Sequence, residues 1–334
     1  MNWLLRISNT HREIAIKELE SLIGAKTSVQ WIMPLLVRID AEKGDIDKII
    51  DKMASLKWVI QNPLLVSPSD FFSLQSDKIA HQIPPTGTDT FAARFNQIMV
   101  NIPELSKSKT ERFVGGLILD CFPSLQVSLD NPNSVYRVCY FIDCYVMGWT
   151  YAEQTFQRIE ESSPKMSPFF GGGAMKPMLT KILVNLLYPL HPIVLDPFCG
   201  HGGFMRGIAS AGSFAIGIEV SMKIARECKV NNQYHQVEQT QIIIGDALHQ
   251  PFRRASIPEI ISDPPYAKQS TTIGRDREDL IERWLNSSDQ ERVLITLPKD
   301  MVFEINNNWK LEYEIDDFVH KSLTRVVRKL VRLK

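Results

Sequence analysis

The sequence contains few cysteines, and none stand in a paired pattern. No two of them form a C-x-x-C motif, and their number is odd. The thiols are Cys121, Cys139, Cys144, Cys199 and Cys228. An odd, scattered set in a chain of 334 residues argues against a disulfide framework, so we expect reduced thiols.

Long apolar runs are also missing. The segment WIMPLLVRI at 31–39 contains Pro34 and Arg38, whereas a membrane-spanning helix needs ~20 successive apolar residues. The segment 1–10, MNWLLRISNT, has no basic stretch and reaches Arg6 before an apolar core of signal-peptide length has formed. We therefore expect a cytoplasmic protein without a membrane segment.

The charges balance, with 38 basic and 38 acidic residues. Composition therefore gives no support for a nucleic-acid partner, and any site for a polyanion has to be a local patch. One candidate follows Asp317, after which no acidic residue occurs. Its cations are Lys321, Arg325, Arg328, Lys329, Arg332 and Lys334. This run fits a phosphate-binding patch and an ordinary solvated face equally well.

Residues 1–66 alternate between extended and helical patterns. Strands are expected at 2–8, 34–40 and 57–62. Amphipathic helices are expected at 11–24 and 45–55. The order β-α-β-α-β suggests a small ferredoxin-like unit.

Residues 67–152 predict a second α+β unit. The expected elements are a helix at 70–83, a strand at 90–98, a helix around 107–121 and two extended runs near 135–150. The stretch 153–176 follows, and the segment ESSPKMSPFFGGGAMKP at 161–177 brings Ser, Pro and three glycines together. This composition is typical of a linker or a functional loop, and we place the domain boundary there.

From 177 to 334, short apolar runs alternate with helical stretches. The expected strands are 192–197, 214–220, 241–247, 259–266 and 292–298, and the expected helices are 203–212, 221–232 and 276–286. Such alternation predicts an α/β fold with a doubly wound, mostly parallel sheet. Ligands of such sheets bind at the carboxyl ends of the strands.

Glycines and acidic residues gather at these strand ends. Asp196 ends one strand, and Gly200, Gly202 and Gly203 form a loop that enters a helix, so a ligand can approach the backbone closely. The loop is neither a Walker motif nor a full G-x-G-x-x-G and is weak evidence alone. Glu219 ends the next strand, where an acid can accept hydrogen bonds from both hydroxyls of a ribose.

Two further strand ends carry carboxylates. Asp246 can receive an adenine amino group, or it can simply cap a turn. Asp263-Pro264-Pro265-Tyr266 follows the next strand. The exocyclic amine of a nucleobase is a poor nucleophile until a carboxylate accepts its hydrogen bonds, which Asp263 can do. The prolines can aim a backbone carbonyl at the same amine, and Tyr266 offers a face on which the base can stack.

These motifs resemble a known family. Asp196-Pro197-Phe198-Cys199-Gly200, Glu219, Asp246 and Asp263-Pro264-Pro265-Tyr266 are similar to the motifs of S-adenosylmethionine-dependent amino methyltransferases. The whole chain resembles the THUMP-containing tRNA guanosine-10 methyltransferases of archaea and eukaryotes. TFAARF and SLQVSLDNPNSVYRVCYFIDCYVMGW resemble a THUMP domain, and HKSLTRVVRKL (320–330) resembles the closing strand of these enzymes.

The resemblance implies a division of the chain. Residues 1–66 form the ferredoxin-like unit, 67–152 a THUMP RNA-binding domain and 153–176 a linker and cofactor-closing loop. Residues 177–334 form a Rossmann-like class I methyltransferase domain with a seven-stranded sheet. The implied partners are a tRNA, held at its acceptor end by the THUMP domain, and a small activating subunit.

The resemblance also implies the role of each site residue. Asp196 and the loop of Gly200, Gly202 and Gly203 hold the methionine part of S-adenosylmethionine, Glu219 its ribose, and Asp246 with Ala247 its adenine. Met175, Cys199, Val220 and Asp263 complete the cofactor set. Asp263, Pro264, Pro265 and Tyr266 are the catalytic residues. No metal is expected, because His201 beside Cys199 lacks further ligands at zinc-like spacing.

The predicted activity is methylation of the exocyclic amine of a guanosine in tRNA, at position 10. Two kinds of alternative stay open. The enzyme could act on another tRNA position, on ribosomal RNA or on adenine in DNA. In a different class, the chain could be a THUMP-type RNA-binding protein without catalysis, which the intact Glu219 and Asp263 argue against.

Overall fold

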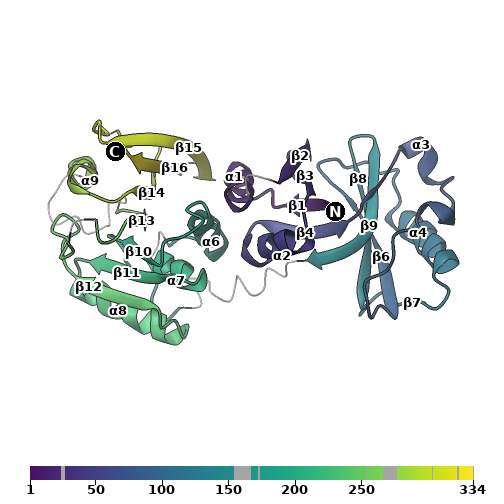
Figure 1. Cartoon of the computed structure of the whole chain (residues 1–334), viewed down its shortest axis with the longest axis horizontal. Coiled ribbons are helices and arrows are strands. Elements are labelled where there is room, and N and C mark those ends of the chain that lie inside the picture. Colours follow the sequence, from purple (N-terminus) through teal and green to yellow (C-terminus); the bar gives the residue numbers. More distant parts are fainter. Residues whose placement is uncertain are drawn as a thin grey trace. The chain divides into compact units, whose positions relative to one another are not determined.

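The computed structural model describes residues 1–23, 27–153, 167–171, 174–253, 255–265, 277–302, 304–321 and 323–333. The chain divides into two compact units (Figure 1). The first comprises Met1–Ser8, Ala25–Ile50 and Leu56–Gln154, and the second comprises Asn9–Gly24, Asp51–Ser55 and Thr155–Lys334. Among the described helices, none is long and apolar enough to cross a membrane.

The first strands of the chain form an antiparallel sheet. Their order is β2 (Ser28–Met33), β3 (Leu36–Asp40), β1 (Asn2–Ile7) and β4 (Leu56–Gln61). Helices α1 (Arg12–Leu22) and α2 (Lys43–Lys52) complete a β-α-β-β-α-β sequence. This order is ferredoxin-like, but it has one strand more than the β-α-β-α-β order predicted from the sequence. The strand β2 was not predicted, and its side chains are mostly exposed or half-buried.

The sheet of the first unit continues through β4 into further strands. These are β9 (Cys144–Glu153), β8 (Ser134–Phe141), β6 (Thr90–Gln97) and β7 (Gln126–Val127), with β5 (Leu64–Val66) paired to β9. Helix α4 (Lys107–Cys121) has the bounds predicted from the sequence, and it packs on β6. The Ser106 hydroxyl caps this helix by accepting a hydrogen bond from the Lys109 amide at 3.3 Å.

The predicted helix at 70–83 is wrong. The structure has a short helix, α3 (Pro68–Phe71), and one 3₁₀ turn, η1 (Ser76–Lys78). The Ser73 hydroxyl donates to the Asp70 carbonyl at 2.9 Å, which offers the backbone a local alternative to a continuing helix. The Trp149 indole then donates to the Gln82 carbonyl at 2.8 Å.

The second unit contains the predicted seven-stranded sheet, drawn in teal to yellow in Figure 1. The strand order is β12 (Thr240–Ile244), β11 (Phe214–Glu219), β10 (Ile193–Asp196), β13 (Glu259–Ser262), β14 (Arg292–Pro298), β16 (Leu323–Arg332) and β15 (Trp309–His320). All pairs from β12 to β14 are parallel, whereas β16 and β15 are antiparallel. The helices are α6 (Pro177–Asn185), α7 (Gly203–Ser210), α8 (Met222–Tyr234) and α9 (Arg277–Ser287). The Rossmann-like prediction is confirmed.

Two short N-terminal segments belong to this second unit. Ile14 of α1 and Ala54 are part of its hydrophobic core. The buried Glu18 carboxylate accepts bonds from the amides of Ala54 and Ser55 at 2.8 and 3.0 Å and from the Asn185 side chain at 2.7 Å. Burial raises the pKa of Glu18, and these hydrogen bonds oppose the shift. The network fixes the end of α6, the helix that also borders the candidate site.

Candidate functional site

A cavity of about 230 Å³ lies at the carboxyl ends of β10 and β13. Its position is the one expected for a ligand site in a doubly wound sheet. The cavity is lined by Phe169, Phe170, Gly171, Ala174, Met175, Thr180, Asp196, Phe198, Cys199, Gly200, His201, Gly203, Phe204, Arg206, Asp263, Pro264 and Pro265. It therefore gathers eight of the predicted site residues: Met175, Asp196, Cys199, Gly200, Gly203, Asp263, Pro264 and Pro265.

Asp196 is the most deeply buried acid of the cavity, with 2% of its surface exposed. Its Oδ1 accepts a hydrogen bond from the Ser262 hydroxyl at 2.5 Å and one from the Phe198 amide at 3.2 Å. Burial raises the pKa of Asp196 to about 7, the nearby carboxylates of Asp263 and Glu219 add to the shift, and the two hydrogen bonds oppose it. The site therefore holds an acid whose ionisation changes near neutral pH.

The glycine loop lines part of the cavity through Gly200 and Gly203. Gly200 and Gly202 have φ of +50° and +84°, a left-handed conformation that favours glycine. A side chain at Gly200 or Gly203 would meet nothing within 4 Å, so a ligand can reach the backbone there. At Gly202 a Cβ would lie 2.6 Å from the Cys228 sulfur, so this glycine permits packing against α8. Cys199 is 5% exposed, and a hydrogen bond with the Cys228 thiol, together with burial, raises the pKa of Cys199.

Glu219 stands at the end of β11, beside this loop. Its carboxylate accepts a bond from the Ser221 amide at 2.8 Å, and the amides of Gly200 and Val220 also donate to it. Burial raises the pKa of Glu219, and these hydrogen bonds oppose the shift. Neither Glu219 nor Val220 lines the cavity described above. Glu219 reaches the site through the backbone of Gly200.

Asp246 and Ala247 follow β12, outside the lining of the cavity. The Asp246 Oδ1 accepts a bond from the Leu248 amide at 3.0 Å, and its Oδ2 lies 3.5 Å from His249 Nδ1. These contacts are typical of a residue that forms a turn after a strand. Ala247 is 6% exposed and packs in the core.

Asp263 lies directly after β13, with Pro264 and Pro265 on the cavity wall. Its Oδ1 accepts a hydrogen bond from the Thr296 hydroxyl at 2.5 Å. Tyr266 lies outside the residues that the structure describes. The structure thus brings the carboxylates of Asp196 and Asp263 to the same cavity.

The segment 167–171 forms a further wall of the cavity. It lies in the stretch predicted to be a linker and cofactor-closing loop, but Phe169 and Phe170 were not named as site residues. The buried Asn231 side chain of α8 accepts from the Phe169 amide at 3.1 Å and donates to the Phe169 and His201 carbonyls at 2.8 and 3.2 Å. Phe169 and Phe170 remain 39% and 56% exposed at the cavity. Two adjacent aromatic residues before a glycine run were the available signal.

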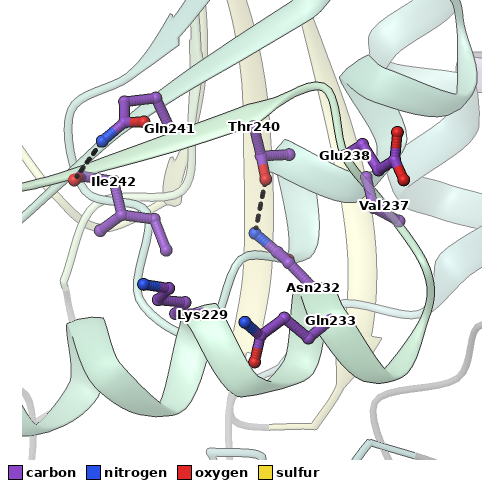
Figure 2. A pocket seen from close by; sticks show the side chains of 8 residues that line it. All are labelled: Lys229, Asn232, Gln233, Val237, Glu238, Thr240, Gln241 and Ile242. Carbon is purple, nitrogen blue, oxygen red and sulfur yellow. Dashed lines mark hydrogen bonds between the residues drawn. The ribbon is translucent and has the colours of Figure 1, made fainter.

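A second pocket of about 250 Å³ lies beside α8 and β12 (Figure 2). It is lined by Lys229, Asn232, Gln233, Val237, Glu238, Thr240, Gln241 and Ile242. The Asn232 amide donates to the Thr240 hydroxyl at 3.2 Å across it. None of the predicted site residues lines this pocket, so the cavity at the strand ends remains the candidate site.

Most of the described cations of the basic C-terminal run are buried or have partners within the second unit. Arg328 and Lys329 of β16 pair with Glu314 and Glu312 of β15 at 2.6 and 3.4 Å. Arg325 is only 7% exposed, and Arg332 donates to the Ser288 carbonyl at 2.5 Å. Lys321 is exposed, whereas Lys334 lies outside the described residues. The sequence did not reveal these pairs, because the acids of β15 come before the basic run in the chain.

Comparison with known proteins identifies the class of the fold. Residues 164–324 match the family described as RMKL-like, methyltransferase domain. TrmN from Thermus thermophilus has a similar fold over 100% of both chains, with a TM-score of 0.62 and 18% identity. The second unit is thus a Rossmann-like methyltransferase domain.

Curated relatives define the family more closely. The chain is 25% identical over its whole length, and over all of the relative, to the tRNA (guanine(10)-N2)-dimethyltransferase of Methanothermobacter thermautotrophicus. It is 30% identical to the enzyme of the same name from Pyrococcus abyssi, over 63% of this chain and 64% of that one. The chain is thus similar to relatives that are named for methylation of guanine 10 in tRNA.

The donor set of the cavity fits S-adenosylmethionine, the cofactor of this class. The carboxylates of Asp263 and Glu219 lie close enough to Asp196 to add to the rise of its pKa, and a cationic ligand relieves that repulsion. The cofactor carries two positive groups, a sulfonium and an ammonium. The open backbone at Gly200 and Gly203 allows the close approach that such a ligand needs.

Proposed function

We propose that this chain methylates the exocyclic amine of a guanosine in tRNA, at position 10, with S-adenosylmethionine as the methyl donor. The observation that supports it most is the cavity that joins Asp196 and the glycine loop to Asp263-Pro264-Pro265. The relatives named for guanine(10)-N2 methylation of tRNA support the substrate.

The proposed chemistry assigns one task to each side of the cavity. When bound, S-adenosylmethionine supplies a methyl group on a sulfonium sulfur, which leaves as a neutral thioether. Asp263 and the Pro264 carbonyl accept hydrogen bonds from the guanine amine, so positive charge on the attacking nitrogen is stabilised as it develops. The Asp263 carboxylate then accepts the proton that the methylated nitrogen loses. Tyr266 provides a stacking face for the extracted base.

The remaining site residues hold the cofactor in this proposal. Asp196, Cys199 and the glycine loop take its methionine part, and Met175 also lines the cavity. Glu219 and Val220 take the ribose, and Asp246 with Ala247 takes the adenine. A ribose would replace part of the backbone contacts that Glu219 now makes.

Transfer of labelled methyl groups to unmodified tRNA, followed by nucleoside mass spectrometry, tests the proposal. We expect N2-methylated guanosine, lost when position 10 of the tRNA is changed to another base. Label in another nucleoside, in ribosomal RNA or in adenine of DNA would identify one of the alternative substrates. Cofactor binding without transfer to any of these would indicate a non-catalytic RNA-binding protein.

The cofactor affinity is expected to depend on pH through Asp196. Because its pKa in the folded protein is raised to about 7, the free carboxyl takes up a proton below that pH, and the ammonium group then loses its anionic partner. We expect Kd, measured by calorimetry, to rise up to about tenfold per pH unit as pH falls below about 7. Asp196→Asn should bind weakly without this slope. A flat profile in the unaltered chain would contradict the role of Asp196.

The raised pKa of Asp196 also determines how the stability of the cofactor-free protein changes with pH. The pKa of Asp196 lies above its ordinary value of 3.8, so the folded state binds more protons than the unfolded state between these values. Stability then falls as pH rises from about 4 to about 7.

The division of labour along the chain is also a proposal. We assign 1–66 to a ferredoxin-like unit, 67–152 to a THUMP domain that grips the tRNA acceptor end, 153–176 to a linker and cofactor-closing loop, and 177–334 to the methyltransferase domain. The continuous sheet that joins β4 to β9 and β8 supports a rigid RNA-binding half. We further propose a cytoplasmic location and a small activating subunit, which co-purification would detect.

Removal of the single-stranded 3′ end of the tRNA is expected to lower kcat/KM at least about tenfold, since an extended RNA held at its end presents one distant base to a fixed pocket. Cofactor affinity should stay the same. The control is the full-length transcript assayed beside the truncated one. Equal kcat/KM values would show that the acceptor end is not gripped.

A further inference from the structure

Two hydroxyl groups donate hydrogen bonds to the two carboxylates of the cavity. The Ser262 hydroxyl donates to Asp196 at 2.5 Å, and the Thr296 hydroxyl donates to Asp263 at 2.5 Å. In each pair the hydroxyl comes from the next strand of the sheet, since β13 is the neighbour of β10 and β14 the neighbour of β13. Neither hydroxyl has been assigned a task so far.

The position of Thr296 follows from the strand register. β13 and β14 run parallel with Ser262 opposite Ile295, so the next residue of β14 comes beside Asp263. Thr296 is 1% exposed, and its neighbours Ile295 and Leu297 are fully buried. A β-branched side chain has few χ1 rotamers, and this packing removes the others. The hydroxyl is therefore held in a fixed direction.

We propose that Thr296 is a positioning residue for Asp263, an inference that rests on the proposed function of the site. A single aspartate side chain can rotate about two bonds, and only some rotamers direct an oxygen at an amine beside Pro264. The short bond from Thr296 selects one of them. Thr296 does not touch the substrate; it keeps Asp263 in the orientation that the attacking nitrogen needs.

Substitutions at Thr296 in the full-length chain test this role. Thr296→Val keeps the shape and removes the hydroxyl, and we expect it to lower kcat about tenfold or more. The KM for tRNA and the Kd for S-adenosylmethionine should stay within about twofold, since the bond matters only for chemistry. Thr296→Ser restores the donor and should recover kcat to within about threefold of the unaltered chain. Thr296→Ala replaces the valine variant if that one does not fold.

Ser288→Ala is the matched control. Its buried hydroxyl donates to the Trp284 carbonyl at 2.7 Å at the end of α9, outside the cavity lining. Its loss can affect stability but should leave kcat unchanged. A decrease in kcat equal to that of Thr296→Val would mean that any lost buried hydroxyl has this effect, and the positioning role would be overturned.

Crystal structures of the valine and serine variants separate the two proposals. We expect the Asp263 carboxylate to turn or split between rotamers in Thr296→Val and to keep its orientation in Thr296→Ser. An unchanged carboxylate, or full kcat in Thr296→Val, overturns the positioning role. If the unaltered chain methylates no tRNA while the carboxylate still turns in the valine variant, the proposed function fails and the positioning role stands.

Discussion

Asp263→Ala is expected to lower kcat by at least ~100-fold, since one preorganised acceptor that acts on developing charge contributes about that much. Its Oδ1 is fixed by the Thr296 hydroxyl at 2.5 Å, and Pro264 and Pro265 beside it line the cavity. The charge it opposes arises only as the guanine amine attacks, so the loss should appear in kcat and not in KM. Single-turnover kinetics with saturating tRNA and cofactor measure it.

Cofactor binding gives the control for this variant. The Kd for S-adenosylmethionine, measured by calorimetry, should change little in Asp263→Ala. Asp279→Ala removes a largely exposed carboxylate of α9, whose contact is with Arg283 at 3.4 Å, and should leave kcat unaltered. Turnover of Asp263→Ala near that of the unaltered chain would refute the proposed chemistry.

Glu219→Ala is expected to weaken S-adenosylmethionine by roughly 2–3 kcal/mol, or about 30- to 150-fold in Kd, through loss of charge-assisted hydrogen bonds to the ribose. The same carboxylate accepts bonds from the backbone of Ser221, Gly200 and Val220. Loosening of the glycine loop should add to the loss. Isothermal calorimetry on the full-length chain measures both the affinity and its enthalpy.

Two further variants identify the origin of that loss. Glu219→Gln keeps an acceptor for the backbone amides but lacks the charge, so its affinity should fall between those of the alanine variant and the unaltered chain. Glu238→Ala alters the exposed acid of the pocket in Figure 2 and should bind the cofactor normally. An unchanged Kd in Glu219→Ala would place the nucleoside elsewhere.

The fold of the second unit could be predicted well because the sequence signals of its strands and of their ends are local. Each strand ends at a residue with chemical meaning, and in a parallel sheet the ends meet at one edge, so Asp196 and Asp263 could be brought together before any coordinates existed. Ser262 and Thr296 are also at strand ends, but their tasks depend on which strands are neighbours. The register that sets Ser262 opposite Ile295 is a tertiary fact that periodicity does not contain.

Other features could not be predicted from periodicity for the same reason. The segment 70–83 has the composition of a helix, yet its chain is diverted by the Ser73 side chain and by bonds between Gln82 and β9. The basic run after Asp317 is largely neutralised by acids that come earlier in the chain. The site roles themselves stay predictions until the variants above are measured.

The second unit combines segments that lie far apart in the chain, and this affects how it folds during translation. Ile14 and Glu18 leave the ribosome early, and Ala54 and Ser55 follow soon after, whereas Asn185 and the other residues of this core appear only after the whole first unit has been translated. Until then the apolar side of α1 has no core to enter, and the Glu18 carboxylate has no amide donor from α6. Contacts so distant along the chain close slowly and leave apolar surface exposed meanwhile. Nascent chains stalled before residue 185 should therefore retain α1 in a protease-sensitive state, and the methyltransferase unit should reach its native core only after release.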